Sequence, residues 1–182
     1  MTAIRVGMAE TYTLPPVTRL AGAESGTLTL LGRDLLLRHR RITMVGLSAN
    51  PSRPSYRVAV HLIAYGYEVV PVNPTLTEVL GRRAHRTLAD VEGGLGIVDV
   101  FRRIEDVPGV VDDALVAGAE AIWLQLGLSS PEAAAAAAAA EVPYVEDRCI
   151  KMEHCRWFGG LNWVGLSTGV VSSRREEVPR AG

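Results

Sequence analysis

The stretch MVGLSANPSRPSY, residues 44–56, joins a predicted strand to a predicted helix. An apolar run ends at Gly46, small polar residues and two prolines follow, and a helical pattern begins at Pro54. Such a turn is typical of an anion-binding loop at the end of a parallel strand, because the first N–H groups of the helix point at the ligand. The G-x-G-x-x-G spacing of a dinucleotide loop is absent, since Leu47 and Ser48 follow Gly46.

Strand and helix patterns alternate on either side of this stretch. Short apolar runs predict five strands, at residues 42–47, 67–72, 97–101, 121–126 and 142–147. Helical spacing and start signals predict helices at residues 28–41, 54–65, 107–119, 131–140 and 148–157. The alternation predicts an α/β fold, with a doubly wound, Rossmann-like sheet of five parallel strands and an extra N-terminal helix. We expect the strand order 3-2-1-4-5, with the binding site at the carboxyl ends of the strands.

Composition limits the class of protein. The chain has 182 residues, 48% of them hydrophobic and 21% charged, which is typical of a soluble globular domain. We expect an irregular arm over residues 1–27, one domain over 28–157 and a tail over 158–182. A net charge of −1 argues against nucleic acid or a membrane surface as a partner, and no signal peptide is recognised, so we expect a cytoplasmic protein. The sequence leaves open whether the chain binds a protein partner or forms a homo-oligomer.

The carboxyl ends of the predicted strands supply the candidate binding residues. They are Gly46, Leu47, Ser48, Asn50, Arg53, Pro54, Ser55 and Tyr56 in the first loop, Val72, Asn73 and Pro74 in the second, Phe101, Arg102 and Arg103 in the third, and Gln125 and Gly127 in the fourth. Guanidinium groups bind phosphate well, so the candidate phosphate partners are Arg53, Arg57, Arg102 and Arg103. NAD fits poorly, because Asn73 stands where an acidic residue would bind the ribose.

Five blocks of the sequence carry a resemblance to a known family. In chain order they are GLSANPSRPSYRVAVHLIAYGYEVVPVNP (46–74), TLADV (87–91), VDVFRR (98–103), WLQLG (123–127) and DRCIKMEH (147–154). Together they resemble the small, stand-alone CoA-binding proteins whose Rossmann domain is of the succinyl-CoA synthetase type. The resemblance covers about residues 40–155, and residues 1–27 and 158–182 lie outside it.

The resemblance implies coenzyme A, free or acylated, as the ligand. It assigns the phosphates to a first loop containing Gly46, Ser48, Arg53, Ser55 and Tyr56. It also implies that Val72, Asn73 and Pro74 border the adenosine end and that Phe101 and Arg102 line the cleft. A neutral Asn73 near arginines suits the 3′-phosphate of CoA better than an aspartate would.

Catalytic and metal-binding patterns are weak. Five residues separate Cys149 from Cys155, which is outside the usual zinc spacing, so we predict reduced thiols and no metal site. No nucleophile or carboxylate pattern surrounds His39, His61 or His85. We therefore predict a non-catalytic CoA-binding module. Two alternatives stay open: an enzyme acting on CoA thioesters, with Cys149 (paired with His154) or a partner chain completing the site, and an NAD-sensing Rossmann domain.

Overall fold

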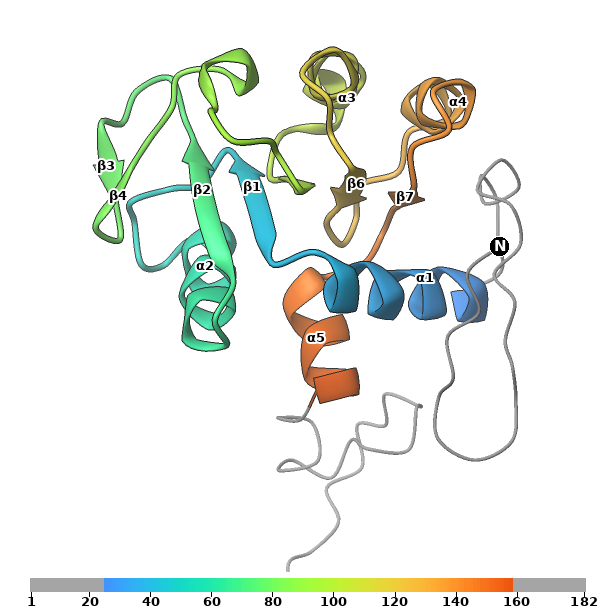
Figure 1. Cartoon of the computed structure of the whole chain (residues 1–182), viewed down its shortest axis with the longest axis horizontal. Coiled ribbons are helices and arrows are strands. Elements are labelled where there is room, and N and C mark those ends of the chain that lie inside the picture. Colours follow the sequence, from blue (N-terminus) through green and yellow to red (C-terminus); the bar gives the residue numbers. More distant parts are fainter. Residues whose placement is uncertain (1–24, 159–182) are drawn as a thin grey trace, which may run out of the picture.

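A five-stranded parallel sheet forms the centre of the structure, which is a computed structural model that describes residues 25–158 (Figure 1). Its strands are β1 (Arg41–Val45), β2 (Glu68–Val72), β5 (Ile97–Val100), β6 (Ala121–Leu124) and β7 (Tyr144–Val145). All neighbouring strands pair in parallel, so the predicted Rossmann-like α/β class is confirmed. Apart from a few residues next to the domain, the expected arm and tail lie outside the described residues.

The strand order differs from the prediction. The observed order is β2-β1-β5-β6-β7, which is 2-1-3-4-5 when the five strands are counted along the chain, so the predicted order 3-2-1-4-5 is wrong. Alternation and handedness predict parallel strands with right-handed crossovers, but they do not say at which edge of the sheet the next strand is added. The third strand returns to the far side of β1, and the switch point therefore lies between β1 and β5.

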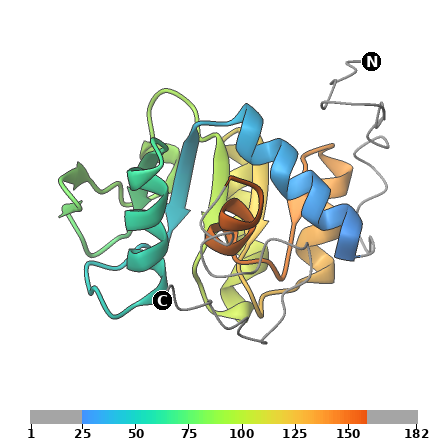
Figure 2. The same cartoon turned by 90° about the horizontal axis from the view of Figure 1, so that it is seen from below.

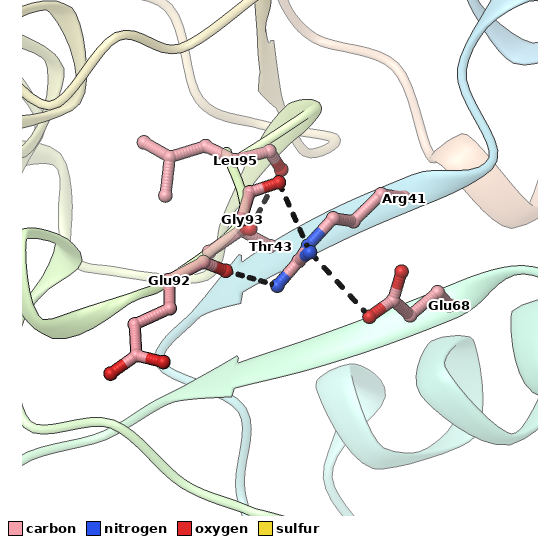
Figure 3. Close-up of polar contacts among 6 residues, drawn as sticks. All are labelled: Arg41, Thr43, Glu68, Glu92, Gly93 and Leu95. Atoms are coloured by element: carbon pink, nitrogen blue, oxygen red, sulfur yellow. Dashed lines mark hydrogen bonds and ion pairs between the residues drawn. The ribbon is translucent and has the colours of Figure 1, made fainter.

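The side chain of Arg41 holds the segment before β5 against the start of β1 (Figure 3). Its guanidinium donates hydrogen bonds to the main-chain oxygens of Glu92, at 2.7 Å, and Gly93, at 3.2 Å. The same group lies 3.7 Å from the carboxylate of Glu68 at the start of β2. One arginine thus ties β1, β2 and the approach to β5 together at the amino end of the sheet.

Thr43 and Gly96 bring β5 still closer to β1. The Thr43 hydroxyl donates to the Leu95 main-chain oxygen at 2.7 Å, and both groups are buried. Gly96 has a φ of 60°, and a Cβ atom there would collide with the main-chain oxygen of Arg41. Only glycine allows this approach, so the GGLG segment, residues 93–96, is where the chain turns to place β5 beside β1.

Helices cover both faces of the sheet. In Figure 1 helices lie both above and below it, and Figure 2 shows the lower ones from their own side. The upper pair is α3 (Val107–Val116) and α4 (Pro131–Ala139); the lower set is α1 (Ser25–Arg38), α2 (Pro54–Ala64) and α5 (Ile150–Phe158). Each of the five predicted helices is present in the described part of the chain, with ends that differ from the prediction by up to three residues. Among the described residues, no helix is long and apolar enough to cross a bilayer.

Alternate residues of each strand face the two helical layers, which gives the domain two apolar cores. Met44 and Trp123 belong to the core under α1, α2 and α5, whereas Val45 and Val98 belong to the core under α3 and α4. Asp99 is fully buried between two residues of the second core, Val98 and Val100. Alternation along β5 therefore directs its side chain to the opposite face, the one covered by α1, α2 and α5.

The alanine run, residues 133–140, gives α4 a packing face of small residues. Ser130 caps the helix, because its hydroxyl oxygen accepts a hydrogen bond from the Ala133 N–H at 3.2 Å. Ala133, Ala134 and Ala137 are buried against the sheet and α3. Short side chains let the α4 backbone approach its neighbours closely.

The long connection between β2 and β5 contains more structure than the sequence pattern predicts. It forms a short antiparallel pair, β3 (Glu78–Val79) with β4 (Arg82–Arg83), and then the 3₁₀ turn η2 (Leu88–Asp90). Leu88 is buried in the core under α3. This turn therefore covers part of the sheet where a crossover helix would normally lie.

Candidate functional site

A cavity of about 630 Å³ opens at the carboxyl ends of β1, β5 and β6. Its size is within the range of about 300–1,000 Å³ that is usual for small-molecule sites. It lies at the switch point, where open α/β sheets bind their ligands. The lining residues are Gly46, Ser48, Arg53, Pro54, Ser55, Val58, Phe101, Arg102, Gln125, Leu126, Leu128, Cys149 and Met152.

The structure brings half of the sequence-predicted site residues into this cavity. Those that line it are Gly46, Ser48, Arg53, Pro54, Ser55, Phe101, Arg102 and Gln125. Those that do not line it are Leu47, Asn50, Tyr56, Val72, Asn73, Pro74, Arg103 and Gly127. The first and third loops thus contribute most of the predicted lining, and the second loop contributes none.

The first loop is held in shape by its own side chains. The Ser48 N–H donates to the Ser55 hydroxyl at 3.1 Å, and the Asn50 N–H donates to the Ser48 hydroxyl at 3.1 Å. The Asn50 side-chain oxygen accepts from the Ser52 N–H at 2.9 Å. Asn50 therefore shapes the loop, although it does not line the cavity.

Asn73 supports the first loop from the end of β2. Its amide N–H donates to the Leu47 main-chain oxygen at 2.9 Å. Its side-chain oxygen accepts from the N–H and the hydroxyl of Thr75, at 3.0 and 2.8 Å. Pro74, next along the chain, lines a separate cavity of about 290 Å³ that also contains Arg83 and Arg86. Of the three adenosine-side residues predicted from the resemblance, only Pro74 lines this second, smaller cavity.

Two arginines reach the main cavity from different loops. Arg53 and Arg102 are exposed, and neither guanidinium has an ion-pair partner within residues 25–158. The other two candidates are engaged outside the cavity. Arg103 lies 4.0 Å from the Asp106 carboxylate, and Arg57 donates to the Pro51 main-chain oxygen at 3.3 Å. The cavity therefore holds two cationic groups that are available to an anionic ligand.

The helix that follows the loop presents further donors. Arg53 is the N-cap residue of α2, it makes no side-chain capping bond, and Pro54 occupies the first turn. The first N–H groups of a helix have no intrahelical acceptor. The positive end of α2 is thus placed beside Ser48, Ser55 and the cavity, as an anion-binding site requires.

A buried polar pair lies beneath the cavity. The Gln125 amide donates to the Asp99 carboxyl at 2.6 Å. Burial raises the pKa of Asp99 to about 8, against the smaller opposing effect of the Gln125 hydrogen bond. The second carboxyl oxygen of Asp99 has no hydrogen-bond partner among the described residues. At neutral pH the Asp99 carboxyl is therefore mostly protonated and uncharged.

Cys149 lies at the cavity wall, but the structure does not give it a histidine partner. Burial raises the pKa of the Cys149 thiol, so the nucleophilic thiolate is disfavoured. No hydrogen bond joins Cys149 to His154 within the described part of the chain. The Nδ1 atom of His154 instead lies 3.1 Å from the Nε2 atom of His61.

Sequence reasoning missed most of the apolar wall of the cavity and named only Cys149 from it, in the enzyme alternative. This wall consists of Val58, Leu126, Leu128, Cys149 and Met152. Leu126 is 65% exposed, two residues after the end of β6, whereas the sequence pattern predicts it as the last residue of that strand. Cys149 and Met152 lie in one of the blocks that resemble the CoA-binding family, and their approach to β1 depends on how α5 packs.

The family of the chain follows from comparison with known proteins. The family model described as "CoA binding domain" matches residues 40–155, which is most of the chain. The chain belongs to the CoA-binding domain family. The family identified from the sequence resemblance is thereby confirmed.

Solved structures of similar proteins share the fold. A hypothetical protein from Pyrococcus horikoshii OT3 is 32% identical, with a TM-score of 0.71 over 84% of this chain and 100% of its own. The Thermus thermophilus protein called cell-free ID.343 is 34% identical, with a TM-score of 0.68 over 71% of this chain and 98% of its own.

A bacterial relative covers a similar region. The uncharacterized protein YneT of Bacillus subtilis (strain 168) is 40% identical over 122 residues, which are 67% of this chain and 90% of YneT. The similarity thus extends over most of the length of YneT.

Proposed function

We propose that the main cavity binds coenzyme A or an acyl-CoA, and that the protein is a binding or regulatory module without its own catalysis. The observation that carries this proposal is that one cavity combines two unpaired arginines and a helix N-terminus with an apolar wall. CoA has the same division, because a charged diphosphate separates its nucleotide from a less polar pantetheine arm.

The polar side of the cavity suits the diphosphate. Backbone N–H groups at the start of α2 offer hydrogen bonds in fixed directions, and Arg53 and Arg102 supply positive charge. Hydrogen bonds to a charged phosphate are stronger than neutral ones. Because Ser48 and Ser55 already bond within the loop, the ligand meets a shaped surface and little ordering is needed.

The apolar side suits the pantetheine arm. Val58, Leu126, Leu128 and Met152 line it, and Leu126 and Met152 expose apolar surface that a ligand would cover. Burial of that surface is favourable by about 25 cal/mol per Å². The arm would then lead past Cys149, so an acyl group on the CoA thiol would also lie within the cavity.

The non-catalytic assignment rests on the protonation of the groups nearest the ligand. The thiol of Cys149 has a raised pKa, and Asp99 is a neutral acid at pH 7. Neither is prepared as a nucleophile or base. The enzyme alternative keeps one observation in its favour, which is that Cys149 lines the same cavity. The NAD alternative lacks an acidic residue at Asn73.

The test is calorimetric titration of the full chain with CoA, acetyl-CoA and NADH. We expect CoA and acetyl-CoA to bind and NADH to bind weakly or not at all. Arg102→Gln should weaken CoA by about tenfold or more, since a hydrogen bond to a charged group contributes about 1.5–3 kcal/mol. Arg103→Gln, the adjacent arginine outside the cavity, is the matched control and should change affinity by less than about twofold.

Two results would overturn the proposal. One is the absence of CoA binding in the folded protein, and the other is an equal loss of affinity in the Arg102 and Arg103 variants. Tighter binding of NADH than of CoA would favour the NAD-sensing alternative. An acyl group found on Cys149 by mass spectrometry after incubation with acyl-CoA, and absent in Cys149→Ser, would favour the enzyme.

A further inference from the structure

Three metal-ligating side chains converge between α2 and α5, away from the main cavity. They are His61 of α2 and His154 and Cys155 of α5. The Nε2 atom of His61 lies 3.1 Å from the Nδ1 atom of His154 and 3.6 Å from the Sγ atom of Cys155. All three candidate ligand atoms lie within 4.8 Å of one another.

These separations are close to those that a tetrahedral metal imposes. Zinc binds imidazole nitrogen at about 2.0–2.1 Å and thiolate sulfur at about 2.3 Å. Tetrahedral angles then place two nitrogens about 3.3 Å apart, and a nitrogen and a sulfur about 3.6 Å apart. The His61–His154 and His61–Cys155 pairs already have nearly these distances, so only the His154–Cys155 pair needs to close, by a small rotation of the Cys155 side chain.

The surroundings hold the two rings in place. The His154 ring, 2% exposed, contacts the rings of Tyr65, Tyr67 and Phe158, with centroid distances of 4.6, 5.4 and 5.0 Å. His61 and Cys155 are partly exposed, which leaves a way in for an ion.

We propose that His61, His154 and Cys155 bind a zinc ion, with water or another small ligand in the fourth position. Two imidazoles and one thiolate form a donor set that zinc favours. On binding, the Cys155 thiol releases its proton to solvent. The proton shared by the two facing ring nitrogens moves to the far nitrogen of its own ring, so both facing nitrogens can donate to the metal.

The ion would join α2 and α5, and the first turns of both helices line the main cavity. Residues 54 and 55 begin α2, and Met152 lies in the first turn of α5. His61 lies two turns further along α2, and His154 and Cys155 lie in the middle of α5, so the metal would tie the last part of α2 to the middle of α5 without entering the cavity. We therefore expect zinc to stabilise the fold strongly and to change CoA affinity little.

The experiment titrates cobalt(II), a spectroscopic substitute for zinc, into chelator-treated full-length protein. We expect one cobalt per chain, visible bands of tetrahedral geometry and a near-ultraviolet charge-transfer band from the thiolate, all lost when zinc displaces cobalt. Cys155→Ser should remove the charge-transfer band, and His61→Gln should weaken zinc by about tenfold or more. His61 is half-buried, so His61→Gln is expected to fold, which circular dichroism checks.

Two matched controls keep the result specific. Cys149→Ser and His85→Gln remove the other cysteine and a histidine outside the cluster, and both should keep the cobalt spectrum. A wild-type protein that gives no thiolate band, or a band that survives Cys155→Ser, would overturn the proposal. So would loss of the band in Cys149→Ser alone. CoA titration of the same samples tests the proposed function independently.

Discussion

Gly46 and Phe101 meet where β1 and β5 end, so closely that a Cβ atom on residue 46 would collide with the Phe101 main-chain oxygen. Gly46 also has a φ of 86°, in the left-handed region that favours glycine. The need for glycine here comes from the neighbouring strand as well as from any ligand. Its substitution should therefore affect folding as well as binding.

Gly46→Ala should destabilise the protein by about 3 kcal/mol, which combines about 1 kcal/mol for the positive φ with about 2 kcal/mol for the collision. Gly66→Ala is the matched control, because Gly66 has a φ of 81° and no atom within 4 Å of the added Cβ. It should cost only about 1 kcal/mol. Urea denaturation measures both, and equal losses would show that the β5 backbone moves aside without cost.

Asp99 should make stability depend on pH. An aspartate in the unfolded chain loses its proton near pH ~4, whereas the folded protein keeps the Asp99 proton up to a pKa of about 8. Between these values the unfolded state binds fewer protons, so stability falls as pH rises, by up to about 1.4 kcal/mol per pH unit. The Asp99→Asn variant carries a neutral amide at this position, which does not titrate in this pH range.

The free energy of unfolding of Asp99→Asn, minus that of the wild type, should therefore increase from pH 5 to pH 8. Urea denaturation at several pH values measures this difference, and other titrating groups cancel in it. Parallel curves for the two proteins would mean that the Asp99 carboxyl is not held protonated in the folded state.

Asn73 tests what the second loop contributes. Its amide N–H supports the Leu47 carbonyl, and an aspartate would face that oxygen with a negative charge and no donor. We expect Asn73→Asp and Asn73→Ala to weaken CoA and dephospho-CoA by similar factors, because both remove the support of the first loop. A loss in Asn73→Asp that is confined to CoA would instead locate the 3′-phosphate beside residue 73.

Salt should weaken CoA binding. Arg53 and Arg102 are exposed, so their attraction for phosphate is screened by ions over about 8–10 Å at physiological ionic strength. Affinity should fall steadily between low and high sodium chloride in calorimetry, and less steeply in Arg102→Gln. An affinity that ignores salt would place most of the recognition on the apolar wall.

The fold class and the elements follow from local patterns in the sequence. The buried run before Gly46 and the Ser130-Pro131 helix start both correspond to observed elements. The strand order does not follow, because the placement of β5 depends on contacts between Arg41 and the GGLG segment some fifty residues away. The hydrophobic periodicity of a single strand or helix does not show which strand will be its neighbour.

The part of the site that the sequence predicts depends on local patterns, and the part that it misses depends on long-range packing. The loops after β1 and β5 were predictable, because the carboxyl ends of parallel strands share one edge. Met152 and the metal cluster were not, since they depend on how α5 packs against α2. His61 and His154 are 93 residues apart in sequence, and spacing rules compare only near neighbours.

The two glycines at opposite ends of the β1–β5 pair have a consequence for motion. Gly96 approaches Arg41 at one end and Gly46 approaches Phe101 at the other, so a slip of either strand by one residue would put a residue with a Cβ atom where only glycine fits. Opening of this pair therefore requires the cores on both faces to separate together. Amide hydrogens in β1 and β5 should be the slowest in the protein to exchange with deuterated water, and those of the β3–β4 pair among the fastest.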